Sequence, residues 1–105
     1  MAFLLRITGE KERALDIYQE LEKNSEDDKE KSLILSDKAV ILQELSHYNE
    51  ALQCYLKAKQ IFINLNKTKD LLRVINNIGT LNFVLKKYRD AEKDFFELLK
   101  MSEEV

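Results

Sequence analysis

The chain has 105 residues, enough for a single small domain, and its 17 Lys and Arg against 19 Asp and Glu give a formal net charge of −2. It contains no Pro and only two Gly. Because β-hairpins and sandwiches need such turn residues, this composition excludes the all-β and α/β classes and favours long helices. Charges of both signs are interspersed, which is typical of a solvated helical surface rather than a nucleic-acid-binding one.

The sequence contains no feature that predicts export or membrane insertion. Its apolar runs are far shorter than the roughly 20 residues that a bilayer-spanning helix needs. The start, Met1 to Arg6, is too short for the apolar region of a signal peptide. The one cysteine, Cys54, cannot form an internal disulfide, so the fold does not depend on an oxidising compartment. We therefore expect a cytoplasmic protein.

Apolar residues recur at helical spacing along nearly the whole chain, so the places where this pattern weakens mark the helix ends. The expected helices are 1–8, 11–23, 30–45, 49–64, 69–86 and 89–102. The polar stretch Asn24 to Asp28 is turn-like, and its carboxylates stand just before the next helix, where they favour the positive end of the helix dipole. Short connections make neighbouring helices antiparallel, so the expected units are helical hairpins.

An internal repeat joins two of these hairpins. Residues 35–61 align without gaps with residues 75–101, at a spacing of 40. The aligned pairs are Ala39 with Gly79, Leu45 with Leu85, Tyr48 with Tyr88, Ala51 with Ala91, and Tyr55 with Phe95. A partial third copy places Ala14 and Tyr18 at a spacing of 37 from Ala51 and Tyr55. Since one hairpin cannot bury its apolar stripe alone, neighbouring hairpins are expected to stack.

Residues of the last hairpin resemble a known repeat family. Ile75-x-x-Ile78-Gly79-x-x-Asn82, followed by Tyr88, Ala91 and Phe95, resembles the tetratricopeptide repeat pattern W-x-x-L-G-x-x-Y…A-x-x-x-F. The preceding hairpin resembles it more loosely, and the first copy only in its second helix. Asn82 stands where the family has an aromatic residue, Lys38 where it has leucine, and no proline closes a repeat.

The resemblance implies an all-α fold, a right-handed superhelix of antiparallel helix hairpins with about two and a half repeats. The single domain 1–105 would then contain a partial repeat 1–24 and two repeats, 30–66 and 69–105. The spacings of 37 and 40 exceed the family's usual 34. They are similar to the longer repeats of kinesin light chains, LGN-like scaffolds and bacterial peptide sensors.

The resemblance also implies a concave groove, lined by the first helix of each pair, that binds a peptide. Counting from Gly79 and Ala39, the groove residues are Arg73, Asn76, Asn77, Thr80, Phe83 and Val84 in the last repeat and Leu33, Ser36, Asp37, Val40, Gln43 and Glu44 in the middle one. An asparagine offers both a donor and an acceptor to a peptide backbone, and Phe83 would form a pocket for one apolar side chain. Whether Asn77 binds a peptide or only forms hydrogen bonds within the stack stays open at this point.

The sequence offers little that could carry catalysis. His47 is the one histidine, lies in a turn, and cannot assemble a zinc site alone. Cys54 lies within a helix with no cationic residue beside it in the sequence, so we interpret it as a packing residue. The acidic residues 26–28 lack the glycine and distal glutamate of a calcium loop. We expect no enzyme activity, no cofactor and no metal site.

The densest basic stretch does not indicate a nucleic-acid-binding protein. It comprises Lys57, Lys59, Lys67, Lys69 and Arg73. Acidic residues elsewhere balance it, and basic clusters of this size are usually solvated surfaces. We therefore expect no direct contact with nucleic acid or with a membrane.

Taken together, these patterns predict a non-catalytic protein–protein interaction module that binds a peptide segment of a partner. Two alternatives stay open. One is a self-associating helical scaffold, a homo-oligomer that joins through exposed apolar ends, with Met1, Phe3 and Leu4 at one end and Phe96, Leu99 and Met101 at the other. The other is the sensory segment of a bacterial peptide-responsive regulator.

Overall fold

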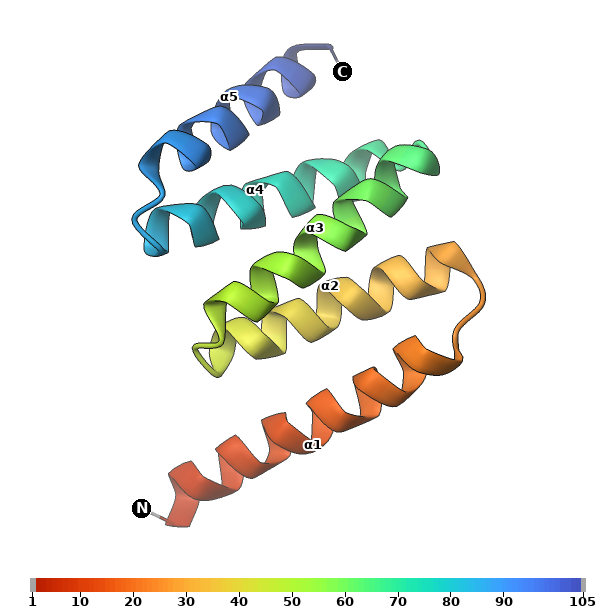
Figure 1. Ribbon diagram of the computed structural model, residues 1–105, viewed down its shortest axis with the longest axis vertical. Helices are drawn as coiled ribbons and strands as arrows, with labels where there is room; N and C mark the ends of the chain where they lie inside the picture. Colours follow the sequence, from red (N-terminus) through yellow and green to blue (C-terminus); the bar gives the residue numbers. More distant parts are fainter. Residues whose placement is uncertain (1, 105) are drawn as a thin grey trace.

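The computed structural model describes the backbone of residues 2–104 and the side chains of residues 9–103. The described residues form five α-helices and no strand, which confirms the predicted all-α class. The helices are α1 (Ala2–Asn24), α2 (Asp28–Glu44), α3 (Tyr48–Asn64), α4 (Thr68–Val84) and α5 (Tyr88–Glu104). Each runs antiparallel to the next, and they follow one another in chain order along the longest axis, with the two termini at opposite ends (Figure 1).

The first helix differs from the prediction. A break at Gly9 was expected to separate helices 1–8 and 11–23, but α1 continues through it from Ala2 to Asn24, so this prediction was wrong. A glycine within a helix costs about 1 kcal/mol relative to alanine, which a long helix tolerates. Apart from Gly9, its chain neighbours and the nearby backbone of α1, no atom of the described residues lies within 4 Å of the place where a Cβ on Gly9 would stand, so no such contact requires glycine there. Met1 lies outside the described residues.

The other four helices are all 17 residues long and begin 20 residues apart, at Asp28, Tyr48, Thr68 and Tyr88. They begin and end within two residues of the predicted bounds. Asp27 caps the first of them, because its side chain accepts a hydrogen bond of 3.1 Å from the amide of Lys29. The 40-residue repeat seen in the sequence therefore consists of two helix–turn units of equal length.

Three identical turns join these four helices. In each turn a leucine is followed by a residue with positive φ: Ser46 (65°), Asn66 (55°) and Lys86 (63°). The next amide then donates back into the helix, over 2.8 Å from His47 to Leu42, 3.0 Å from Lys67 to Phe62 and 2.7 Å from Lys87 to Asn82. This is the Schellman arrangement, which usually contains glycine at the positive-φ position. It ends each helix here without either glycine or proline.

The aligned small residues lie where the helices approach one another. Ala39 and Ala51 are 0% exposed, and Ala91 is 3% exposed. A Cβ on Gly79 would come within 2.9 Å of the ring of Phe95, the aromatic residue that follows Ala91 by four positions. Close packing at these positions therefore depends on the absence of larger side chains.

Two departures from the tetratricopeptide pattern have polar partners in neighbouring helices. The ammonium of Lys38 lies 3.2 Å from a carboxylate oxygen of Glu22 in α1. The amide Nδ2 of Asn82 donates to Oδ2 of Asp94 in α5 over 2.6 Å. Burial raises the pKa of Asp94, although the hydrogen bond from Asn82 opposes that shift. Both residues thus join helices by polar contacts at positions where the tetratricopeptide pattern has leucine and an aromatic residue.

The molecule is extended rather than closed into a globule. Its principal extents are 47 × 34 × 18 Å and its radius of gyration is 14.7 Å, whereas a compact domain of this length is expected near 13 Å. Every extensive helix contact joins helices that are consecutive in the chain, as in a helical repeat. Within the described part of the chain, no helix is both long enough and apolar enough to cross a membrane.

Candidate binding groove

A hollow lies between α2 and α4, and we call it the α2–α4 groove. It consists of two adjoining pockets of about 150 and 510 Å³, which share Val40, Tyr55 and Asn77. Tyr55 and Phe62 of α3 are 1% and 3% exposed, so they form its bottom. The groove therefore has α2 and α4 as walls and aromatic side chains beneath.

The α2 wall contains all six residues that the sequence assigned to it. They are Leu33, Ser36, Asp37, Val40, Gln43 and Glu44. These positions recur at spacings of three and four residues, so they share one face of the helix. The sequence analysis counted these positions outward from Ala39. Ala39 itself is buried on another face of α2.

The α4 wall contains only some of the residues predicted for it. Arg73, Asn77 and Val84 line the groove. Asn76, Thr80 and Phe83, which were also predicted, line neither pocket. The prediction that these three residues contact a peptide thus has no support from the groove's lining.

The three predicted residues outside the groove are exposed. The hydroxyl of Thr80 donates to the backbone carbonyl of Asn76, one turn earlier, over 2.9 Å. Phe83 is 60% exposed, and its ring lies edge-to-face against Tyr88 with 5.4 Å between the ring centroids. Phe83 therefore packs across the α4–α5 turn, whereas the sequence analysis expected it to form a pocket for a peptide side chain.

Sequence analysis missed the aromatic bottom of the groove. Tyr48, Tyr55 and Phe62 all line it, and they recur every seven residues, which places them on one stripe of α3. That spacing was visible in the sequence, where Tyr55 was considered only as an aligned position of the repeat. Asp70, one turn before Arg73 on the α4 wall, was missed as well.

Two polar groups in the groove have no hydrogen-bond partner among the described residues. The hydroxyl oxygen of Ser36 is buried and unpaired. Asn77 is partly buried, and its amide forms no hydrogen bond. The two residues line the same pocket from opposite walls. Buried polar groups are rarely left unpaired in proteins, so the Ser36 hydroxyl is a candidate for ligand contact, and the accessible amide of Asn77 stands opposite it in the same pocket.

The charged residues of the groove give it a modest excess of negative charge. Asp37 and Asp70 line the groove together with Arg73, and none of these three side chains forms an ion pair with another described residue. Glu44, at the other end, lies 3.4 Å from the ammonium of Lys11 in α1, which partly offsets its charge. Near Asn77 the groove therefore favours a positively charged group.

Tyr55 contributes a neutral hydroxyl to the groove. Burial raises the pKa of Tyr55 to about 12, and the neighbouring Cys54 and Asp37 add to this shift. The phenol therefore stays protonated at physiological pH. Its hydroxyl lies 3.4 Å from the side-chain oxygen of Gln43, a long hydrogen bond that a ligand acceptor could replace.

The two residues considered for catalysis are not placed together. Cys54 is buried, as the packing interpretation predicted, and burial raises the pKa of its thiol, which disfavours the reactive thiolate. His47 is exposed in the turn before α3. Among the described residues, no three His, Cys, Asp or Glu side chains lie close enough together to hold a metal ion.

Comparisons with known proteins identified no relative of this chain. No family model matches the chain, and no curated protein or solved structure matches it significantly. The fold is thus established as five sequential antiparallel helices, consistent with a helical repeat. Membership of the tetratricopeptide family stays a prediction, which rests on the resemblance of the residues around Gly79 to the family's pattern.

Proposed function

We propose that this protein is a non-catalytic interaction module with a tetratricopeptide-like, right-handed superhelical architecture, which holds a peptide segment of a partner protein in the α2–α4 groove. The 20-residue period of helices and turns and the buried small residues support the repeat. The groove lies between the first helices of two successive pairs, where the family resemblance puts the binding surface. Cys54 is the only cysteine and requires no oxidising compartment, which fits a cytoplasmic protein.

The observation that carries this proposal is the buried, unpaired hydroxyl of Ser36, which lines the same pocket as the accessible side-chain amide of Asn77 on the opposite wall. A buried polar group without a partner costs about 1–3 kcal/mol. An extended peptide offers a backbone N–H and C=O at every residue, so it could satisfy both groups at once. A ligand that does so recovers a cost that the unbound protein already bears.

The groove also indicates the chemistry of the peptide. Val40 and the ring of Tyr55 give it an apolar surface. The smaller pocket is about 150 Å³, and a cavity of about that size holds one benzene ring, so it admits one apolar side chain. Asp37 and Asp70 outnumber Arg73, which favours a cationic neighbour. We therefore expect the bound segment to combine an apolar residue with a nearby lysine or arginine.

Selection from a random peptide library displayed on phage tests the proposal and requires no partner protein. We expect enriched peptides to share an apolar residue beside a basic one. Asn77→Ala should then weaken binding of a selected peptide at least about tenfold, because both a donor and an acceptor are lost. Calorimetry measures this affinity.

Asn76→Ala is the matched control for that experiment. Asn76 is the preceding residue of the same helix but is exposed and lines neither pocket. The control should bind like the wild type, and both variants should keep the wild-type melting temperature. A selection that enriches no peptide, or equal affinities for wild type and Asn77→Ala, would contradict the proposal.

A further inference from the structure

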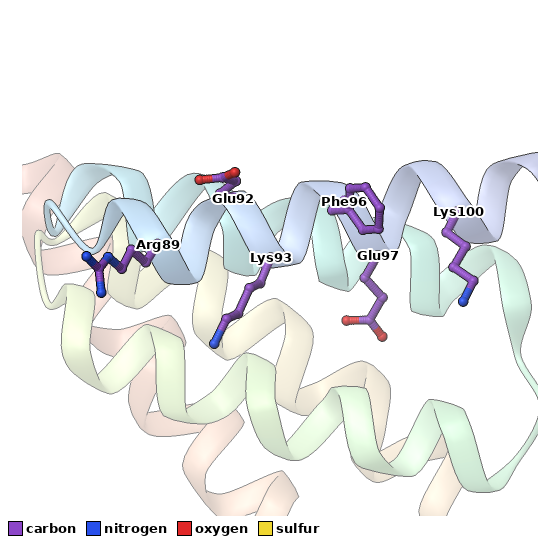
Figure 2. A pocket seen from close by; sticks show the side chains of 6 residues that line it. All are labelled: Arg89, Glu92, Lys93, Phe96, Glu97 and Lys100. Atoms are coloured by element: carbon purple, nitrogen blue, oxygen red, sulfur yellow. The ribbon is translucent and has the colours of Figure 1, made fainter.

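The last helix, α5, has an exposed face that no other helix covers. Its residues, which we call the outer stripe, are Arg89, Glu92, Phe96, Leu99, Lys100 and Glu103. Phe96 is 70% exposed and Leu99 is 59% exposed, large values for apolar side chains. Ala91, on the other side of α5, is buried against the rest of the molecule. In Figure 2, Glu92 points to the side of α5 that is away from the other helices, whereas Arg89 and Lys100 extend toward the side where those helices lie.

This face is the C-terminal apolar end that the sequence analysis expected, with one difference. Phe96 and Leu99 are exposed as expected, whereas Met101 is partly buried. The side chains of Met1, Phe3 and Leu4, expected at the opposite end, lie outside the described residues. A hollow of about 590 Å³ lies beside Phe96.

The charges of the outer stripe are arranged symmetrically about Phe96, but with opposite signs. Glu92 stands four residues before Phe96 and Lys100 four residues after it. Arg89 stands seven residues before it and Glu103 seven residues after it. With a rise of 1.5 Å per residue, these pairs lie about 6 Å and about 10.5 Å to either side of the ring. A half-turn about an axis at Phe96 therefore brings each charge level, along the helix axis, with one of opposite sign on the second copy.

We infer that the outer stripe is a docking surface for a second copy of this chain, with the two α5 helices antiparallel about a two-fold axis at Phe96. The two phenylalanine rings pack on each other. Glu92 pairs with Lys100 of the second copy and Arg89 pairs with Glu103 of the second copy, each twice by symmetry.

The charges of the outer stripe indicate both what binds there and in which direction the two α5 helices run. A parallel pair of α5 helices would place Glu92 against Glu92 and Lys100 against Lys100, which is repulsive. The antiparallel pair converts all of these contacts into attractions. The charge pattern of the outer stripe is complementary to itself. Only binding to a second copy of the same stripe requires such self-complementarity, so a second copy is the partner that we infer.

Sedimentation equilibrium of the full chain tests this inference. One helix stripe from each copy is smaller than a standard interface, so association should be weak and visible between about 10 µM and 1 mM. The wild type should pass from monomer to dimer over that range. Phe96→Ser should stay monomeric with an unchanged helical circular dichroism spectrum, because the ring is exposed. A wild type that is monomeric throughout, or a Phe96→Ser variant that dimerises like the wild type, overturns the inference.

Charge reversal tests the antiparallel geometry itself. Glu92→Lys and Lys100→Glu should each weaken dimerisation at least about tenfold, since two attractions become two repulsions across the axis. Lys69→Glu makes the same charge change on an exposed lysine of α4 and should leave dimerisation unchanged. The decisive experiment mixes the two variant proteins. The Glu92→Lys variant should form a heterodimer with the Lys100→Glu variant, because each pair of side chains at these two positions across the axis again has opposite charges. Single variants that dimerise normally, or a mixture that stays monomeric, would show that the two helices do not meet in this way.

Discussion

Replacing Tyr55 with alanine is expected to lower the free energy of unfolding by about 3–5 kcal/mol, the usual cost of removing a large buried aromatic side chain. Tyr55 is 1% exposed and packs within the central cluster formed by α2, α3 and α4. Natural domains are stable by only about 5–15 kcal/mol, so the variant should be close to unfolding. Urea denaturation followed by circular dichroism measures the change.

Tyr55→Phe is the matched control for this substitution. It keeps the ring and removes only the hydroxyl, whose one hydrogen bond, to Gln43, is long at 3.4 Å. Its cost should therefore stay below about 1 kcal/mol. If Tyr55→Ala cost no more than Tyr55→Phe, the ring could not be a part of the core.

Enlarging Ala51 to leucine should destabilise the protein by about 1–3 kcal/mol, because the site has no room for additional carbon atoms. Ala51 is 0% exposed and belongs to the same central cluster as Ala39. Leucine is nearly as good a helix former as alanine, so the loss would come from packing and not from the helix itself. The midpoint of urea unfolding would report it.

Gln53→Leu provides the comparison on the same helix. Gln53 is exposed two residues beyond Ala51, so the added apolar side chain meets no closed interior. We expect its stability to lie within about 0.5 kcal/mol of the wild type. Equal stability of the two leucine variants would mean that the α2–α3 hairpin is not closely packed at Ala51.

The α2 wall of the groove could be predicted from the sequence, whereas the α4 wall could be predicted only in part. Helical periodicity groups residues into faces, but it does not give the rotation of a helix relative to its neighbours. Counting outward from Gly79 therefore included both the groove residue Asn77 and its exposed neighbour Asn76. The rotation of α4 depends on its packing against both α3 and α5, which no local pattern records.

Other differences between prediction and structure arise from contacts distant in the chain. Lys38 and Asn82 looked like imperfections in a repeat, yet they pair with Glu22 and Asp94 in neighbouring helices. Gly9 resembled a helix break, because a glycine followed by charged residues, here Glu10 and Lys11, interrupts the apolar spacing of a helix. The helix continues there because nothing else in the local sequence, such as a proline, ends it.

The most direct test of the account is a nuclear magnetic resonance titration of the ¹⁵N-labelled protein with a selected peptide. The side-chain amide signals of Asn76 and Asn77 report two adjacent residues, of which only Asn77 lines the groove. The account predicts that the Asn77 side-chain signal moves on binding, together with the backbone signals of Ser36 and Val40, while the Asn76 side-chain signal stays in place. Movement confined to the outer stripe of α5, with the Asn77 side-chain signal unchanged, would contradict it.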